Sequence, residues 1–121
     1  MVKYTSEELH EALQVVSSTI NQCEKMHPKF AEGTSQHSLL KNRIKSLYVS
    51  KSLITNDNVI SQYTKEELME TLRPMTSIIS KCEKAQLKFE EDTSHHTRLQ
   101  NIIKAMYISK SLITNEINKR N

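Results

Sequence analysis

The sequence predicts an all-α protein, a tandem αα-hairpin repeat that forms an antiparallel four-helix arrangement with pseudo-two-fold symmetry. The first observation is an internal repeat, because residues 4–56 recur as residues 63–115 at a constant offset of 59. The second is composition: glycine occurs once and proline twice among 121 residues, which disfavours sheets and turns. We therefore expect a single domain, 1–121, in which a short linker, 57–62, joins the two copies.

The first helix of each copy begins with a capping signal. Thr5 precedes Glu8 by three residues, and Thr64 precedes Glu67 in the same way, which is the spacing of a capping box. Residues at alternating steps of four and three then form one apolar stripe, which predicts a helix of about 26 residues. The stripe consists of Leu9, Leu13, Val16, Ile20, Cys23, His27 and Phe30 in the first copy, and of Leu68, Leu72, Met75, Ile79, Cys82, Gln86 and Phe89 in the second.

A turn and a second helix complete each copy. Gly33 and Asp92 mark the break, since glycine is common just past a helix end. Thr34-Ser35 and Thr93-Ser94 can cap the next helix, which is expected to run to about Thr55 in the first copy. Its inner face comprises Leu40, Ile44, Leu47 and Ile54.

The two prolines fall inside predicted helices. Pro28 lies late in the first helix, and Pro74 lies ten residues into the third. Because proline removes a backbone donor, Pro74 should kink its helix near Glu70. The terminal segments, Met1–Lys3 and Asn118–Asn121, are expected to fray.

Bulk composition indicates a protein of the cytoplasm. The apolar content is 36% and the charged content 26%, and no apolar run approaches the ~18 residues of a membrane-spanning helix. The N-terminal residues lack the apolar core of a signal peptide. Cys23 and Cys82 stand at equivalent points of the two copies, and we expect them to be reduced, buried and inert.

Motifs for catalysis and metal binding are not found in the sequence. No CxxC, HxxxH or HExxH spacing occurs, which argues against a metal site. Ser35 and His37 can be paired as nucleophile and base, but no third orienting group or oxyanion loop accompanies them. The sequence predicts a protein that is not an enzyme and needs no metal or cofactor.

The charge pattern gives little support for nucleic acid as a partner. The formal net charge is +3, which favours anionic partners only slightly. Lys41, Arg43 and Lys45 make the second helix basic, but aromatic residues are too few for a stacking platform. A solvated basic face is the simpler interpretation, and neither nucleic acid nor membrane is predicted as a partner.

One cation in each copy falls on the apolar stripe of the second helix. Lys51 lies within about 20° of the centre of that stripe on a wheel of 100° per residue. A cation there is costly unless its head group reaches solvent or meets an anion. Two interpretations are open: the lysine snorkels from the last helical turn, or polar residues around it bind an anionic ligand. The candidate ligand-binding residues are Lys51, Tyr48, His37 and Thr55 in the first copy and Lys110, Tyr107, His96 and Thr114 in the second.

Small residues mark another side of the same helix. Ser46, Ser50 and Leu53 have Ala105, Ser109 and Leu112 as their counterparts. Because small side chains permit close approach of helices, we expect this side to pack between the two copies.

The run Gly33–Lys45, followed by Tyr48–Ile54, resembles short helical-hairpin proteins of Gram-positive bacteria and their phages, most of which are uncharacterised and about one repeat long. A small, cysteine-poor helical chain is also similar in style to the phage sponge proteins that sequester cyclic nucleotide immune signals. By analogy of size and helical character alone, this second likeness implies an anti-defence role.

These observations predict a non-enzymatic binding module that sequesters or senses a small anionic, nucleotide-like ligand, cyclic nucleotides included. Lysine would neutralise phosphate, hydroxyl groups would hydrogen-bond it, and tyrosine would stack on a base. The alternative is a protein-interaction or adaptor module that acts through exposed helix faces. Weak nucleic-acid binding is a third reading, and a homo-oligomer is compatible with each of them.

Overall fold

Every regular element is a helix in the computed structural model, which describes residues 3–120. The four α-helices are α1 (Ser6–Met26), α2 (Ser35–Ile54), α3 (Lys65–Gln86) and α4 (Ser94–Lys119). Two short 3₁₀ helices, η1 (His27–Lys29) and η2 (Asn58–Gln62), follow the first and second of them. The predicted all-α class is confirmed. Over the same described residues, no helix is long and apolar enough to cross a membrane.

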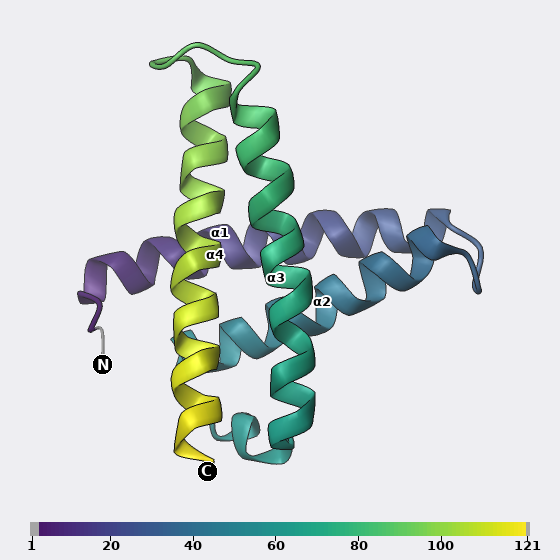
Figure 1. Cartoon of the computed structure of the whole chain (residues 1–121), viewed down its shortest axis with the longest axis vertical. Helices are drawn as coiled ribbons and strands as arrows, with labels where there is room; N and C mark the ends of the chain where they lie inside the picture. The colour runs from purple at the N-terminus through teal and green to yellow at the C-terminus, as the bar shows by residue number, and fades with distance from the viewer. Residues whose placement is uncertain (1–2, 121) are drawn as a thin grey trace.

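The α-helices form two pairs that cross each other (Figure 1). α1 and α2 run antiparallel and pack together, and α3 and α4 do the same. The second pair lies across the first, so that α4 packs on α1 and α3 packs on α2. The helices within each pair are antiparallel as predicted, but the pairs do not stand side by side in up-down order. The loop end of each pair therefore projects beyond the crossing.

Helix starts and turns follow the predicted chemistry. Thr5 and Thr64 form complete capping boxes, in which each threonine oxygen accepts from the backbone of Glu8 or Glu67 and the glutamate accepts in return. Thr34 and Thr93 cap α2 and α4 in the simpler one-bond form. Gly33 and Asp92 both have positive φ, 86° and 72°, which confirms them as the break between helices.

Two helix ends differ from the prediction. α1 ends at Met26 and continues as η1, because Pro28 has no N–H to donate to the helix. α4 runs to Lys119, so the expected fraying of Asn118–Asn121 is wrong within the described residues. Arg120 holds this end in place by donating to the carbonyl oxygens of Ile60, at 2.8 Å, and Tyr63. Of the segments expected to fray, Met1, Val2 and Asn121 lie outside the described residues.

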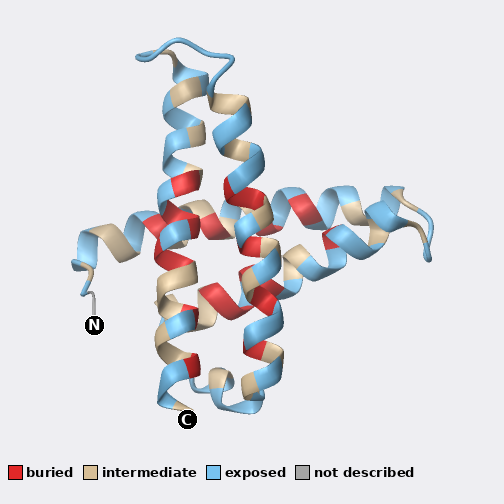
Figure 2. Ribbon diagram, viewed as in Figure 1, coloured by how far each residue is buried: buried red, intermediate tan, exposed pale blue. Residues whose placement is uncertain are grey.

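The core sits where the two pairs cross (Figure 2). The predicted stripes supply much of it: Val16 and Met75 are both 0% exposed, and Leu47 is as well. Two further residues, Val49 and Ile108, are buried although they lie outside those stripes. A helix of one pair contacts its own partner and the crossing pair, and so it buries more than one face.

Small side chains are buried on α2 and α4, and Ser50 Oγ of α2 lies 3.7 Å from Met75 Sδ of the second copy. Ser46, Ser50, Ala105 and Ser109 are each at most 2% exposed, and these two helices are in contact. The hydroxyl groups of Ser50 and Ser109 donate to carbonyl oxygens of their own helices, both at 2.9 Å, so their burial leaves no donor unpaired. The prediction that this side packs between the copies is confirmed, and the small residues let the helices cross closely.

The two cysteines are free thiols with different degrees of burial. Cys23 is buried and Cys82 is half-buried. Burial raises the pKa of both thiols, and the charge of Arg43 opposes that rise in each case. The expected burial therefore holds for Cys23 and only partly for Cys82.

Candidate functional site

Two of the four predicted ligand residues of the first copy use their hydroxyl groups within the protein. Tyr48 is 39% exposed, and its hydroxyl donates to Glu24 Oε2 at 3.0 Å. This hydrogen bond raises the pKa of Tyr48. Thr55 Oγ1 donates to the carbonyl oxygen of Lys51 at 2.9 Å. Lys51 is half-buried, and the three residues share a helix face through their spacing of three and four.

His37 does not join this group. It lies eleven residues before Tyr48, which places it about 16 Å away along the axis of α2. Its ring packs against His27, with 4.1 Å between the ring centroids. The histidine therefore belongs to the loop end of the first pair, whereas the lysine and threonine belong to the opposite end of the same helix.

The second copy repeats this separation. Thr114 Oγ1 donates to the carbonyl oxygen of Lys110 at 2.8 Å, Tyr107 is 49% exposed, and His96 lies eleven residues before it. None of the eight residues is among those that line the two grooves described next. Their role in binding stays a prediction.

A groove between α2 and α3 and its counterpart between α1 and α4 are two of the cavities formed by the crossing. We call the first of them the α2–α3 groove, and its volume is about 520 Å³. Within it, Lys45 Nζ lies 3.6 Å from Glu67 Oε2, and both side chains remain about two-fifths exposed, at 43% and 40%. The groove is lined by Asn42, Lys45 and Ser46 from α2 and by Glu67, Met69, Glu70, Thr71, Arg73 and Pro74 from α3.

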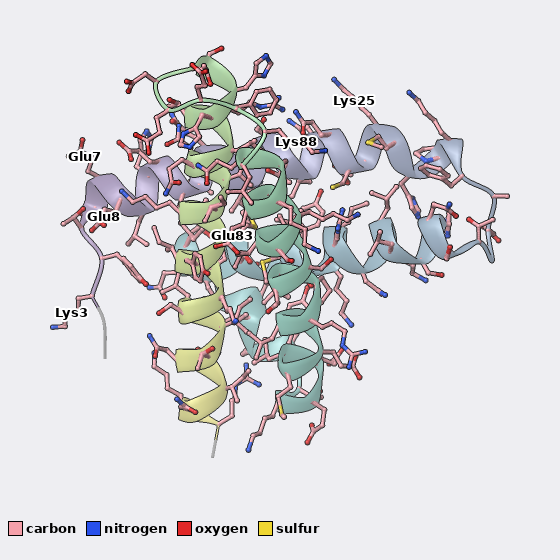
Figure 3. All side chains as sticks on the ribbon, turned by 45° about the horizontal axis from the view of Figure 1, so that its top comes forward. Lys3, Glu7, Glu8, Lys25, Glu83 and Lys88 are labelled. Atoms are coloured by element: carbon pink, nitrogen blue, oxygen red, sulfur yellow. The ribbon has the colours of Figure 1, made fainter. Side chains whose placement is uncertain are left out.

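The second cavity lies between α1 and α4, and we call it the α1–α4 groove. Its volume is about 230 Å³, and Glu8 lines it from the N-terminal end of α1 (Figure 3). Its lining residues are Glu8, Glu11, Ala12, Gln14, Val15, Asn101, Lys104, Ala105 and Ile108.

The two grooves are built from equivalent positions of the repeat. The four polar residues shared by both are separated by the repeat offset of 59: Glu67 and Glu8, Glu70 and Glu11, Asn42 and Asn101, and Lys45 and Lys104. Four other lining positions differ between the copies: Arg73, Pro74 and Thr71 stand where the first copy has Gln14, Val15 and Ala12, and Ser46 has Ala105 as its counterpart. The crossing thus makes one polar groove twice, with different chemistry mainly along the wall of the first helix of each copy.

The carboxylates of the grooves serve the helix starts as well. Backbone hydrogen bonds from Thr5 and Thr64 hold the pKa of Glu8 and Glu67 below the usual value for glutamate. Lys104 lowers the pKa of Glu8 further, and Lys45 does the same for Glu67. Both carboxylates are therefore ionised, and the capping hydrogen bonds fix their orientation. The lysine of each groove is not held by a cap, so its ammonium group can reorient toward a ligand.

The predicted site did not include these residues, and identity between the copies is the signal that could have found them. Asn42 and Lys45 recur unchanged in the second copy, yet the sequence does not show that they face the glutamates of a different helix. The grooves come from the crossing of the two pairs, so a stripe analysis of single helices misses them.

Outside the grooves, two buried side-chain nitrogen atoms have no hydrogen-bond partner among residues 3–120, His27 Nε2 and Arg43 Nε. Nη2 of the same arginine donates to Ser77 Oγ at 3.3 Å. No group of three metal-binding side chains occurs in this described part of the chain. The grooves are the candidate site because both carry the same two glutamates, asparagine and lysine.

Comparisons with family models, with curated proteins and with solved structures gave no match. The interpretation of the grooves therefore rests on their own residues.

Proposed function

We propose that the protein is a non-enzymatic binding module that holds a small anionic, nucleotide-like ligand between its two helix pairs. We also propose that an approximate two-fold axis relates the two copies. The observation that carries the proposal is the pair of grooves, because two independent helix contacts present the same glutamates, asparagine and lysine. Packing alone does not require four identical polar residues at a surface.

The groove chemistry suits a ligand with two kinds of polar group. The lysine supplies a cation for a phosphate, and the glutamates accept hydrogen bonds from N–H groups such as those of a base. The Lys45–Glu67 pair is exposed enough to be weak, so the lysine can turn to a ligand at little cost. A nucleotide carries both kinds of group in one molecule.

A ligand screen with matched charge variants tests the proposal. We expect nucleotides or cyclic nucleotides to raise the melting temperature of the wild-type protein, more at low salt than at high salt. The double variant Lys45→Gln/Lys104→Gln should lose this shift.

The control is Lys25→Gln/Lys84→Gln, which removes the same charge from equivalent exposed positions of the repeat. Lys25 extends from α1 into solvent (Figure 3) and lines neither groove. The control should keep the shift. If no nucleotide, cyclic nucleotide or sugar phosphate shifts the wild type, the ligand-binding function is wrong.

A protein-interaction module is the second candidate, and one observation favours it. At the loop end of the second pair, Leu87 is 87% exposed and Phe89 is 39% exposed. Apolar side chains at a projecting loop are typical of a protein contact. If the ligand screen is negative, this reading takes the place of the first.

A further inference from the structure

We propose that the α2–α3 groove alone binds the ligand, and that the ligand is a nucleoside phosphate whose base carries an amino group. The inference rests on the proposed function and goes beyond it by naming the groove, the ligand class and the residues that separate the two copies. In this arrangement the phosphate of the ligand binds Lys45 and Arg73, and the amino group of its base donates to the backbone carbonyl of Glu70.

Size separates the two grooves first. Small-molecule sites usually enclose roughly 300–1,000 Å³. The α2–α3 groove, at about 520 Å³, falls within that range, whereas the α1–α4 groove, at about 230 Å³, falls below it. A neighbouring hollow between α1 and α4 is also about 520 Å³, but its lining has neither the two glutamates nor the lysine of the grooves. The buried residue Ala12 lines the smaller groove where Thr71 lines the larger one. Because alanine is smaller than threonine, this position does not explain the smaller volume.

Charge separates them in the same direction. The α2–α3 groove has two cations, Lys45 and Arg73, beside its two glutamates, whereas the α1–α4 groove has Lys104 as its cation beside two glutamates. Among the described residues, no ion pair engages Arg73. Because guanidinium binds phosphate in a bidentate manner, Arg73 is the group that makes this groove the better anion site.

Backbone chemistry gives the third difference. Pro74 lies inside α3 and has no N–H, so the carbonyl oxygen of Glu70 lacks its helical hydrogen-bond donor. Both residues line the α2–α3 groove. The equivalent position in α1 is Val15, whose N–H keeps the helical bond. The free carbonyl is therefore an acceptor that only one of the two grooves has.

The three differences together describe the ligand. Two cations, Lys45 from the α2 wall and Arg73 from the α3 wall, favour an anionic group, and a carbonyl oxygen without its helical donor, next to two carboxylates, favours an N–H donor. Adenosine 5′-monophosphate satisfies both requirements, ribose 5-phosphate satisfies the first, and adenosine satisfies the second. Purine riboside 5′-monophosphate keeps the phosphate and the ring but lacks the amino group, so it isolates the contact to Glu70.

The experiment is isothermal titration of the full chain with these four compounds, using the other repeat as the source of the substitutions. We expect one adenosine 5′-monophosphate per chain, bound about tenfold or more tightly than purine riboside 5′-monophosphate. Arg73→Gln, which installs the residue of the first copy, should weaken binding of every phosphate compound by about tenfold or more. Lys84→Gln removes one charge away from both grooves and should bind like the wild type.

Pro74→Val separates ligand binding from folding. This change returns the N–H that the helix lacks, so the melting temperature should rise. It should also erase the preference for adenosine 5′-monophosphate over purine riboside 5′-monophosphate, while ribose 5-phosphate binds as before. A variant that is more stable and yet has lost its preference has not lost it through unfolding.

The possible failures of the two proposals are distinguishable. Binding of two molecules per chain, or equal weakening by Lys104→Gln and Lys45→Gln, would overturn the assignment to one groove and leave the binding function intact. An unchanged amino preference in Pro74→Val would overturn the role of Glu70. Cyclic nucleotides serve as a fifth probe. If neither they nor any of the four compounds binds, the proposed binding function is wrong.

Discussion

The two copies of the repeat share the centre of their buried core and differ at the surfaces between them. Val16 and Met75 are equivalent and fully buried, and so are Ser50 and Ser109. In contrast, Pro74 has a valine as its counterpart across the repeat. The crossing buries these central positions in both copies, because each copy packs on the other. The residues of the groove walls are packed less tightly by the crossing. The two copies can therefore carry different side chains there, as they do at Pro74 and Val15.

The copies also differ in how firmly their ends are held. Leu68, at the start of α3, is 0% exposed, whereas its counterpart Leu9 is half-buried. Arg120 ties the end of α4 to the linker, while the equivalent position of the first copy is the exposed Ser61. The second pair is therefore the more firmly packed at the end opposite its loop, where α3 begins and α4 ends. Stability measurements can test this difference.

The largest expected effect comes from truncating the buried leucine. Leu68→Ala should lower the free energy of unfolding by about 2–5 kcal/mol, since it leaves a cavity in a fully packed site. Leu9→Ala should cost clearly less, because its site is open to solvent. Urea denaturation of both variants measures the difference, and equal costs would mean that the two helix starts are equally packed.

The next effect concerns the anchor of the C-terminal helix. Arg120→Ala should lower the free energy of unfolding by about 1.5–3 kcal/mol, because it removes charge-assisted hydrogen bonds from a half-buried guanidinium. Arg120→Lys keeps the charge but not the planar guanidinium group, so its free energy of unfolding should lie between those of the wild type and Arg120→Ala. Chemical denaturation measures the loss. Wild-type stability in Arg120→Ala would show that α4 needs no tie to the linker.

A smaller effect, equal in both copies, is expected at the helix caps. Thr5→Ala and Thr64→Ala should each lower the free energy of unfolding by about 1 kcal/mol, because both remove an N-cap acceptor. Unequal costs would break the equivalence of the two helix starts.

The caps also predict a pH dependence. The pKa values of Glu8 and Glu67 are lower in the folded state than in the unfolded state. Their contribution to the free energy of unfolding is therefore fully present at pH values above the pKa of the unfolded state. It is lost as the pH falls through the folded pKa. Thermal unfolding of the wild type and of Glu8→Gln/Glu67→Gln between pH 7 and acid should show a weaker dependence in the variant.

The smallest effect is expected at the lysines on the apolar stripe. Lys51→Met/Lys110→Met should leave the free energy of unfolding unchanged to within about 0.5 kcal/mol or raise it slightly, since it removes a cation and adds apolar area. Nucleotide binding should be unchanged if the grooves hold the ligand. Loss of binding in this double variant would place the site at Lys51, Tyr48 and their counterparts, and would refute the groove assignment.

Local chemistry was readable from the sequence because it depends on neighbours in the chain. The capping boxes at Thr5 and Thr64 need residues three apart, and the breaks at Gly33 and Asp92 need one residue with positive φ. An apolar stripe likewise reports which side of a helix avoids water, since that side recurs every three or four residues.

The relation between the helix pairs was decided only in the tertiary structure. Val49 and Ile108 are buried by the crossing although neither lies on a predicted stripe. Lys45 meets Glu67 across two helices, and Arg120 reaches a linker about 60 residues earlier in the chain. Such contacts depend on the crossing of packed surfaces, to which all four helices contribute at once. A periodicity read along one helix carries no information about that crossing, and the grooves exist only because of it.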